Sequence, residues 1–226
     1  MSVLTTTELI LEPWPLRPDR PMAPSRVTVS RLKGAIDRVA ALGGLVMCSW
    51  LFALIAIAIK LDSPGPVFFT QTRLGRDKKP FTIYKFRTMV SDADAQGHDL
   101  RHRQRISGIL FKDEDDPRLT RVGRFLRRTS LDELPQLINI WRREMSLVGP
   151  RPLPLEDTRY YEDWQWGRLA VLPGLTGLWQ VSGRSRLSAE QMVRLDLHYI
   201  QRWSLALEFS IILKTFVVLA TRDGAY

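Results

Sequence analysis

The sequence has few of the residues that build disulfide frameworks and metal centres. Cys48 is the only cysteine, which excludes an internal disulfide and a cysteine-based zinc site. None of the three histidines lies in an HExxH context. His98 and His102 are four residues apart, but the surrounding stretch is polar and indicates a loop, so we expect no metal site there.

Nucleotide-binding signatures and a secretory leader are also missing. The chain contains neither GxxxxGK[ST] nor GxGxxG, so nothing supports an ATPase, a kinase or a dinucleotide-dependent enzyme. No compact apolar stretch with a small-residue cleavage site follows a basic start, and we expect no signal peptide. Prolines recur too often in residues 1–30 for a helix or a central strand, which predicts a flexible arm.

Acidic residues are fewer than basic residues in this sequence. Thirty-three Lys and Arg residues against 24 Asp and Glu give a formal net charge of +9. This excess predicts anionic partners, namely phosphorylated metabolites, acidic lipid headgroups or nucleic acid, with a solvated basic surface as the alternative. The chain has 226 residues, of which 45% are hydrophobic, enough for one core or for one domain with a membrane element.

Residues 40–59 carry no charge at all. A helix of that length reaches about 30 Å, the hydrocarbon thickness of a bilayer. The segment is apolar on every face, which suits lipid better than a half-buried surface, although a buried core helix has the same pattern. We therefore predict a membrane helix over residues 31–60.

Basic residues flank this helix on both sides. They are Arg26, Arg31, Lys33 and Arg38 before it, and Lys60, Arg73, Arg76, Lys78 and Lys79 after it. A single crossing has one basic side, because cytoplasmic loops collect Lys and Arg, so we expect a re-entrant path. Such a path needs a break, which Gly43, Gly44 or Ser49 would provide. Ser49 is expected to bend the helix by bonding back to the carbonyl of Leu45.

Residues 61–226 have the pattern of a single small domain. Residues 67–69 and 81–86 are predicted to be strands, and residues 190–201 and 205–220 helices. A further helix near residues 119–128 has an apolar stripe opposite arginines, which fits either a membrane-interface helix or an ordinary surface helix. The last helix is expected to pack on the domain or to lie on the membrane. The predicted fold class is α+β, mostly helical.

Two adjacent carboxylates, Asp132 and Glu133, follow the arginine pair Arg127 and Arg128. Pro135 belongs in the first turn of the next helix, which places both carboxylates at its N-terminal end. Acidic residues at a helix start commonly do no more than complement the dipole and cap free amides.

A chemical role for this acidic pair is the alternative. A carboxylate can act as a covalent nucleophile toward phosphorus, and a neighbouring carboxylate can hold a divalent cation. The arginines would supply the positive charge that an anionic transition state requires. Two further segments have the composition of phosphate-handling loops. Arg151 lies between two prolines, and residues 173–184 combine three glycines, a tryptophan and a terminal arginine, a mix that could hold a nucleotide.

Several of these segments occur together, in order, as the motifs of a known family. They are residues 59–66, 71–75, 85–89, 116–118, 130–136, 145–152 and 173–184, and Asp196 with Tyr199. Over residues 31–226 the chain resembles the bacterial sugar transferases, the monotopic phosphoglycosyl transferases that start cell-surface glycan assembly. It resembles their short form, because neither a multi-span segment nor an extra soluble domain precedes Arg31.

The resemblance implies a two-step reaction. Asp132 would attack the β-phosphate of a UDP-sugar and expel UMP, and a polyprenyl (undecaprenyl) phosphate would then accept the sugar-phosphate. Glu133 would help to hold Mg²⁺. The implied phosphate-binding surface consists of Arg127, Lys85, Arg151, Arg87, Arg118 and Arg184.

The resemblance also implies where the protein works. The active site would lie at the cytoplasmic face of the bacterial inner membrane, with UDP-sugar, polyprenyl phosphate and membrane lipid as partners, no nucleic acid, and room for a homo-oligomer. The chain departs from the family at the membrane helix, where Ser49-Trp50 replaces the common Ser-Pro, and at Lys33-Gly34, where Lys-Arg is common. The alternatives are a membrane-tethered nucleic-acid-binding protein and a scaffold without catalysis. Against the first, aromatic residues do not interleave with the basic runs.

Overall fold

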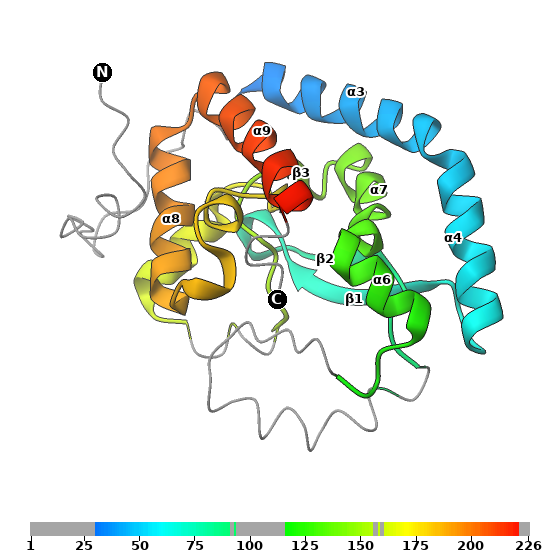
Figure 1. Ribbon diagram of the computed structural model, residues 1–226. Coiled ribbons are helices and arrows are strands. Elements are labelled where there is room, and N and C mark those ends of the chain that lie inside the picture. Colours follow the sequence, from blue (N-terminus) through cyan, green and yellow to red (C-terminus); the bar gives the residue numbers. More distant parts are fainter. Residues whose placement is uncertain (1–29, 91–92, 94–115, 156–157, 159–160, 222–226) are drawn as a thin grey trace.

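The computed structural model describes residues 30–90, 93, 116–155, 158 and 161–221. Residues 1–29 of the predicted arm and the two neighbouring histidines, His98 and His102, lie outside these residues. Figure 1 shows helices arranged around a two-stranded hairpin. The chain is mostly helical with two small sheets, so the predicted α+β class is confirmed.

The apolar segment forms two helices that meet at Cys48. Helix α3 spans Arg31–Met47, α4 spans Ser49–Asp62, and the pair is bent by 60°. Among the described helices, none is long and apolar enough by itself to cross a membrane, whereas this bent pair passes the same test together. A break near the middle was predicted. The predicted acceptor was wrong, because the Ser49 hydroxyl donates to the carbonyl of Val46 at 2.9 Å, one residue later than Leu45.

The first sheet is the antiparallel hairpin of β1 (Phe68–Leu74) and β2 (Pro80–Phe86). Strand β1 is longer than predicted, because its polar second half is paired with β2 and needs no apolar pattern of its own. The short 3-10 helix η1 (Arg76–Lys78) closes the hairpin. The second sheet pairs β3 (Ser146–Val148) in parallel with β4 (Gly174–Thr176) and was not predicted.

The remaining elements follow in chain order. They are α6 (Arg121–Thr129), η3 (Leu131–Glu133), α7 (Gln136–Trp141), η5 (Asp163–Ala170), η6 (Trp179–Val181), η7 (Arg184–Arg186), α8 (Ala189–Arg202) and α9 (Leu205–Thr221). Helix α8 begins at a capping box, in which the Ser188 hydroxyl and the Gln191 side chain each bond the other residue's backbone N–H. The predicted helices at 190–201 and 205–220 are confirmed.

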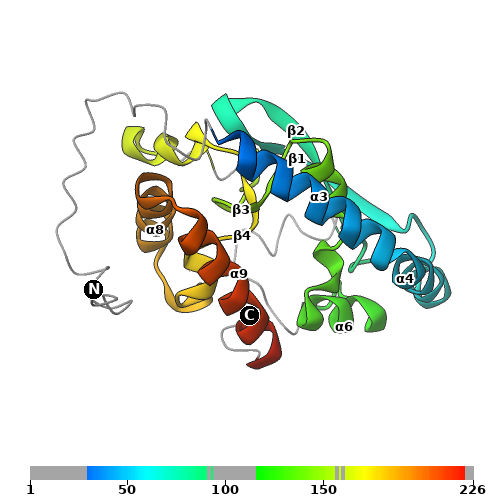
Figure 2. The ribbon, with the colours of Figure 1, turned by 90° about the horizontal axis from the view of Figure 1, so that it is seen from above.

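Both halves of the bent pair pack on the domain with one face only. Ala41 of α3 belongs to a core cluster with Ile83 and Ile140, and Ile59 of α4 lies in a cluster with Phe86. The third and largest cluster joins α8, α9, β3 and η6. Helices α3 and α9 lie on the same side of the molecule, seen in front in Figure 2.

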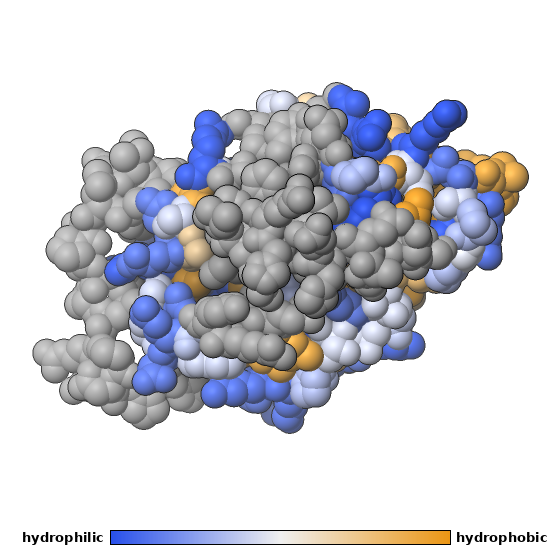
Figure 3. Space-filling model, turned by 90° about the horizontal axis from the view of Figure 1, so that it is seen from below, coloured by the Kyte–Doolittle hydropathy of each residue, from blue (hydrophilic) through white to orange (hydrophobic). Residues whose placement is uncertain are grey.

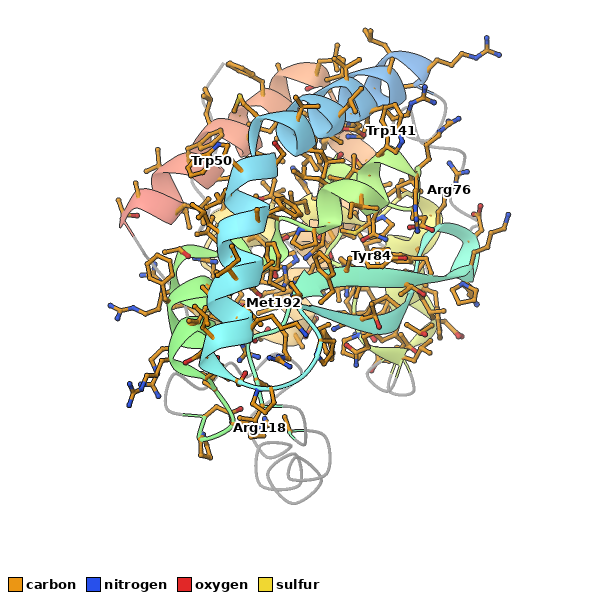
Figure 4. The ribbon with its side chains drawn as sticks, turned by 90° about the vertical axis from the view of Figure 1, so that its right-hand side faces the viewer. Trp50, Arg76, Tyr84, Arg118, Trp141 and Met192 are labelled. Atoms are coloured by element: carbon orange, nitrogen blue, oxygen red, sulfur yellow. The ribbon has the colours of Figure 1, made fainter. Side chains whose placement is uncertain are left out.

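The outer face of α3, α4 and α9 is strongly apolar. Its exposed large side chains are Leu32, Ile36, Val39, Leu42, Val46, Met47, Trp50, Leu54, Ile57 and Leu61 on the bent pair, and Leu205, Phe209, Leu213, Phe216, Val217 and Leu219 on α9. Trp50 lies at the bend (Figure 4). Viewed from the side away from α3, the coloured residues are mostly hydrophilic (Figure 3). Most of the exposed large apolar side chains among the described residues therefore lie on α3, α4 and α9.

A buried charge cluster joins α3 to α9. The Lys33 ammonium lies 2.5 Å from Glu208 Oε1 and 3.5 Å from Asp37 Oδ2. Glu208 also accepts hydrogen bonds from the Tyr199 hydroxyl and the Trp203 indole N–H. Lys33, counted above among the basic residues before the apolar run, is therefore buried, and its side chain neutralises buried carboxylates.

Candidate active site

The acidic pair lies in η3, between α6 and α7. Helix α6 ends where Ser130 takes a left-handed conformation with φ of 57°, and the next three residues form a single 3-10 turn. Pro135 is the N-cap residue of α7, so the carboxylates precede that helix as predicted. Asp132 and Glu133 are 4% and 8% exposed, which is rare for acidic residues without charged partners.

Glu133 is held by cations from two other parts of the chain. The Lys85 ammonium, on β2, lies 2.8 Å from Oε1. The Arg151 guanidinium, on the loop after β3, donates to Oε1 at 2.6 Å and to Oε2 at 3.3 Å. Burial is the largest single effect on the pKa of Arg151 and lowers it, but the charge and hydrogen bonds of Glu133 and the charge of Asp132 together outweigh burial, so the pKa is raised. The bidentate pair fixes the plane of the carboxylate.

Arg127 approaches the acidic pair from α6. Its Nε donates to the Thr88 hydroxyl at 3.0 Å, which holds the half-buried side chain in place. Burial lowers the pKa of Arg127, and the opposing charge of Asp132 is the largest effect that raises it. The tertiary structure thus places Lys85, Arg127 and Arg151 around Asp132 and Glu133, from three separate elements.

The other three predicted phosphate ligands have different surroundings. Arg87 donates to the carbonyls of Ser63 and Pro64 at 2.7 and 2.8 Å, and so clamps the turn after α4. Arg118 forms a buried bidentate pair with Asp116 at 2.8 and 2.6 Å. Figure 4 shows Arg118 at the end of the molecule opposite Trp141. Arg184 lies in η7, next to η6.

Three glycines of the two predicted loops, Gly149, Gly174 and Gly177, lie where two backbones pack closely together. A Cβ on Gly174 would lie 2.1 Å from the backbone nitrogen of Gly149, and one on Gly177 would lie 2.4 Å from the Gly149 carbonyl oxygen. These backbones touch where β3 meets β4. Trp179, the ring of the second loop, is buried in the largest core cluster, so it offers no exposed face to a base.

Asn139 is a site-supporting residue that the sequence analysis missed. Its Oδ1 accepts from the backbone N–H of Tyr84 at 3.1 Å, and its Nδ2 donates to the carbonyl of Thr82 at 2.7 Å. The amide thereby imitates a neighbouring strand along β2, just before Lys85. A polar residue inside the apolar run 137–141 was the available signal.

The acidic pair has the right chemistry for some, but not all, of the ligands of a divalent cation. Mg²⁺ in phosphate-transfer sites is commonly held by one or two carboxylates together with substrate phosphates and water. Asp132 and Glu133 can supply such a pair. Among the described residues no group of three His, Cys, Asp or Glu side chains is placed to hold a metal, so the other ligands would come from substrate and water.

Comparison with known proteins gives consistent results. The sequence pattern of the family described as "Bacterial sugar transferase" matches residues 28–222. The chain is 41% identical over 194 residues to "Galactosyl transferase CpsE" of Streptococcus agalactiae, covering 85% of the chain and 43% of that protein. It is 40% identical over 199 residues to "Undecaprenyl-phosphate galactose phosphotransferase" of Salmonella typhimurium, with coverage of 86% and 42%.

A third relative is matched over most of its length. This is "UDP-glucose:undecaprenyl-phosphate glucose-1-phosphate transferase" of Caulobacter vibrioides, 43% identical over 219 residues, with 93% of the chain and 77% of the relative covered. The chain spans less than half the length of the first two relatives.

Proposed function

Since the chain belongs to the bacterial sugar transferase family, we propose that it transfers a sugar-1-phosphate from a UDP-sugar to polyprenyl phosphate and releases UMP. The names of the Salmonella and Caulobacter relatives describe this chemistry for those proteins. The observation that carries the proposal is the buried acidic pair, with Glu133 fixed by Lys85 and Arg151. Three cations around two carboxylates leave a net positive site suited to a diphosphate.

In the first step an Asp132 carboxylate oxygen attacks the β-phosphorus of the UDP-sugar. The bond between that phosphorus and the oxygen bridging to the α-phosphorus breaks, and UMP leaves with the bridging oxygen. The product is an aspartyl sugar-phosphate. Lys85, Arg127 and Arg151 stabilise the charge that grows on the phosphoryl oxygens, because they are fixed in a poorly hydrated site.

In the second step a phosphate oxygen of the polyprenyl phosphate attacks the same phosphorus. The bond to Asp132 breaks, the carboxylate is restored, and the polyprenyl diphosphate sugar is formed. When bound at Glu133, Mg²⁺ would neutralise charge on the diphosphate. No proton has to be removed from either nucleophile, so neither step needs a general base.

The acceptor is a lipid, and the apolar face of the protein suits that substrate. We propose that the bent pair α3–α4 enters the cell membrane and returns to the cytoplasmic face, while α9 lies along the surface. There the protein would initiate exopolysaccharide or other surface-glycan assembly. The alternative of a nucleic-acid-binding or scaffold protein does not account for the acidic pair and its three cations.

UMP release from a panel of UDP-sugars, with and without polyprenyl phosphate, tests the proposal. Asp132→Asn should lower the rate by about a thousandfold or more, the scale for loss of a nucleophile. The exposed Asp163→Asn is the matched control and should keep the wild-type rate. Labelled sugar should stay on the wild-type protein when the acceptor is omitted, and should be absent from Asp132→Asn. Wild-type UMP release by Asp132→Asn would show that the nucleophile is another group.

A further inference from the structure

The loop that carries Arg151 is held through three successive carbonyl groups. The Pro150 carbonyl accepts from the backbone N–H of Gly174 at 2.8 Å. The Arg151 carbonyl accepts from Arg168 Nη2 at 3.1 Å, and the Pro152 carbonyl from Arg73 Nη1 at 3.2 Å. Prolines on both sides of Arg151 already restrict its backbone. Each donor comes from a different element, so the position of this loop is set by tertiary contacts.

Arg168 is a buried donor whose guanidinium has further partners. It is 3% exposed and lies on η5. Its Nη1 donates to the Tyr161 hydroxyl at 2.8 Å, and its Nη2 is shared between the Arg151 carbonyl and the carboxylate of Asp196. Asp196, on α8, is 1% exposed. A guanidinium is planar with fixed donor directions, so these partners determine where it can meet the Arg151 carbonyl.

We propose that Arg168, oriented by Asp196 and Tyr161, is a positioning residue for Arg151. The chain of contacts runs from Asp196 to the Arg168 guanidinium, to the Arg151 backbone, and from the Arg151 guanidinium to both oxygens of Glu133. Arg168 is not a catalytic residue, because its contacts are to the Arg151 backbone and not to the acidic pair. A shift of the Arg151 backbone moves its guanidinium, and misplacement of about 1 Å at a reacting centre can cost a hundredfold in rate.

This inference rests on the proposed function for its kinetic consequence, although not for its structural one. A purely structural role for the buried pair is the competing explanation, since breaking a buried pair destabilises a fold by itself. The positioning role and the purely structural role predict different coupling between substitutions at Asp196 and Arg151. If Asp196 acts through Arg151, its substitution should matter little once the Arg151 side chain is altered, because effects along one path are not additive.

The kinetic test is a double-mutant cycle on UMP release by the full chain. Asp196→Asn and Arg168→Lys should each lower kcat by about 10- to 100-fold, the range for supporting residues, with a smaller change in KM. Tyr161→Phe, which removes one hydroxyl, should have a milder effect in the same direction. In an Arg151→Lys background, adding Asp196→Asn should lower kcat by less than about a further twofold. Arg194→Ala, which breaks the exposed pair with Glu190 on the same helix, should leave the rate unchanged.

Amide hydrogen exchange gives a second measurement that does not need activity. In Asp196→Asn, exchange should rise in the peptide covering residues 147–155, while α9 stays protected as in the wild type. In the Arg194→Ala control, amide exchange in the peptide covering residues 147–155 should stay at the wild-type level.

Three results would overturn the inference. They are wild-type kcat in both Asp196→Asn and Arg168→Lys, an equal loss from Asp196→Asn in both backgrounds, and unchanged exchange at residues 147–155. If the wild-type protein released no UMP from any UDP-sugar, the proposed function would fail, and the exchange experiment would still decide the positioning role.

Discussion

The carboxylate of Asp62, at the end of α4, accepts a hydrogen bond from the backbone N–H of Val122, in the first turn of α6, at 2.9 Å. It adds to the local cap, in which the Thr120 hydroxyl accepts from the Gly123 N–H. Helix α6 leads directly into the turn that carries the acidic pair. The end of the apolar bent pair is therefore fastened to the element that delivers Arg127 to the site.

Replacing Asp62 should loosen this attachment. Asp62→Ala removes an acceptor at a helix N-terminus, and we expect a loss of about 1 kcal/mol in the free energy of unfolding. UMP release should fall as well, because α6 carries Arg127. Asp77→Asn, at an exposed turn whose left-handed backbone asparagine tolerates, is the control and should change neither quantity. Unfolding in detergent and the UMP assay check both points, and an unaltered unfolding midpoint would contradict the capping role.

The Lys33–Glu208 ion pair makes a stronger prediction. Lys33→Met leaves the carboxylates of Asp37 and Glu208 buried together without their cation, which should cost about 3–5 kcal/mol. Lys214→Met, on the same helix as Glu208 but exposed, should be nearly neutral. Thermal unfolding of both variants in the same detergent measures the difference. Equal stability of the two would mean that α3 and α9 are held by apolar contacts alone.

Asn139 should affect activity through β2. Asn139→Asp keeps the acceptor for the Tyr84 N–H but loses the donor to the Thr82 carbonyl, leaving a buried charge in its place. We expect a loss of about 1–3 kcal/mol in stability and a lower kcat, because β2 carries Lys85. Asn139→Ser, which keeps a donor but is too short to bridge both groups, should fall in between. Hydrogen exchange at the Tyr84 amide reports the change directly, and unaltered exchange would contradict the strand-like role.

The pH dependence of the first step should reflect Asp196. Burial raises the pKa of its carboxyl to about 6, against the lowering effect of Arg168, and Asp196 in turn helps to raise the pKa of Tyr199. The ordinary value is 3.8, so between pH 3.8 and about 6 the folded state binds a proton that the unfolded state lacks. Its contribution to stability therefore falls as the pH rises through that window.

Activity should change in the opposite direction. Below about pH 6 the protonated Asp196 no longer balances the charge of Arg168, so UMP release without acceptor should fall as the pH drops. Omitting the acceptor removes its own titrating phosphate from the measurement. The acid limb should be flatter in Asp196→Asn, and an identical limb in that variant would assign it to another group.

The proposed re-entrant path predicts the side from which labels react. Arg31→Cys and Lys79→Cys, each made in a Cys48→Ser background, place single exposed thiols at the first residue of the bent pair and beyond its end. In sealed membrane vesicles of known orientation, both should react with an impermeant maleimide from the cytoplasmic side. Reaction from opposite sides would mean that the pair crosses the membrane.

The sequence by itself determined the features that depend on local pattern. The charge-free run predicted the apolar helix, its two basic flanks predicted the break, and the order Arg127, Asp132, Glu133, Pro135 placed two carboxylates just ahead of a helix. Composition and spacing suffice for these features, because helix formation, capping and turns depend on neighbours within a few residues.

Only the tertiary structure decided which charges meet. The family resemblance matched Lys85, Arg127 and Arg151 to basic positions of a phosphate-binding surface, and added Arg87, Arg118 and Arg184 after them. The fold brings the first three to the acidic pair, while Arg87 clamps a turn and Arg118 pairs with Asp116.

The supporting residues were also beyond sequence reasoning. Asn139 reaches a strand 57 residues away, and Arg168 joins the Arg151 backbone to Asp196 on α8. A guanidinium or an amide has the same donors wherever it lies. Its role is set by the partners that long-range packing places within about 3 Å, and no local pattern records them.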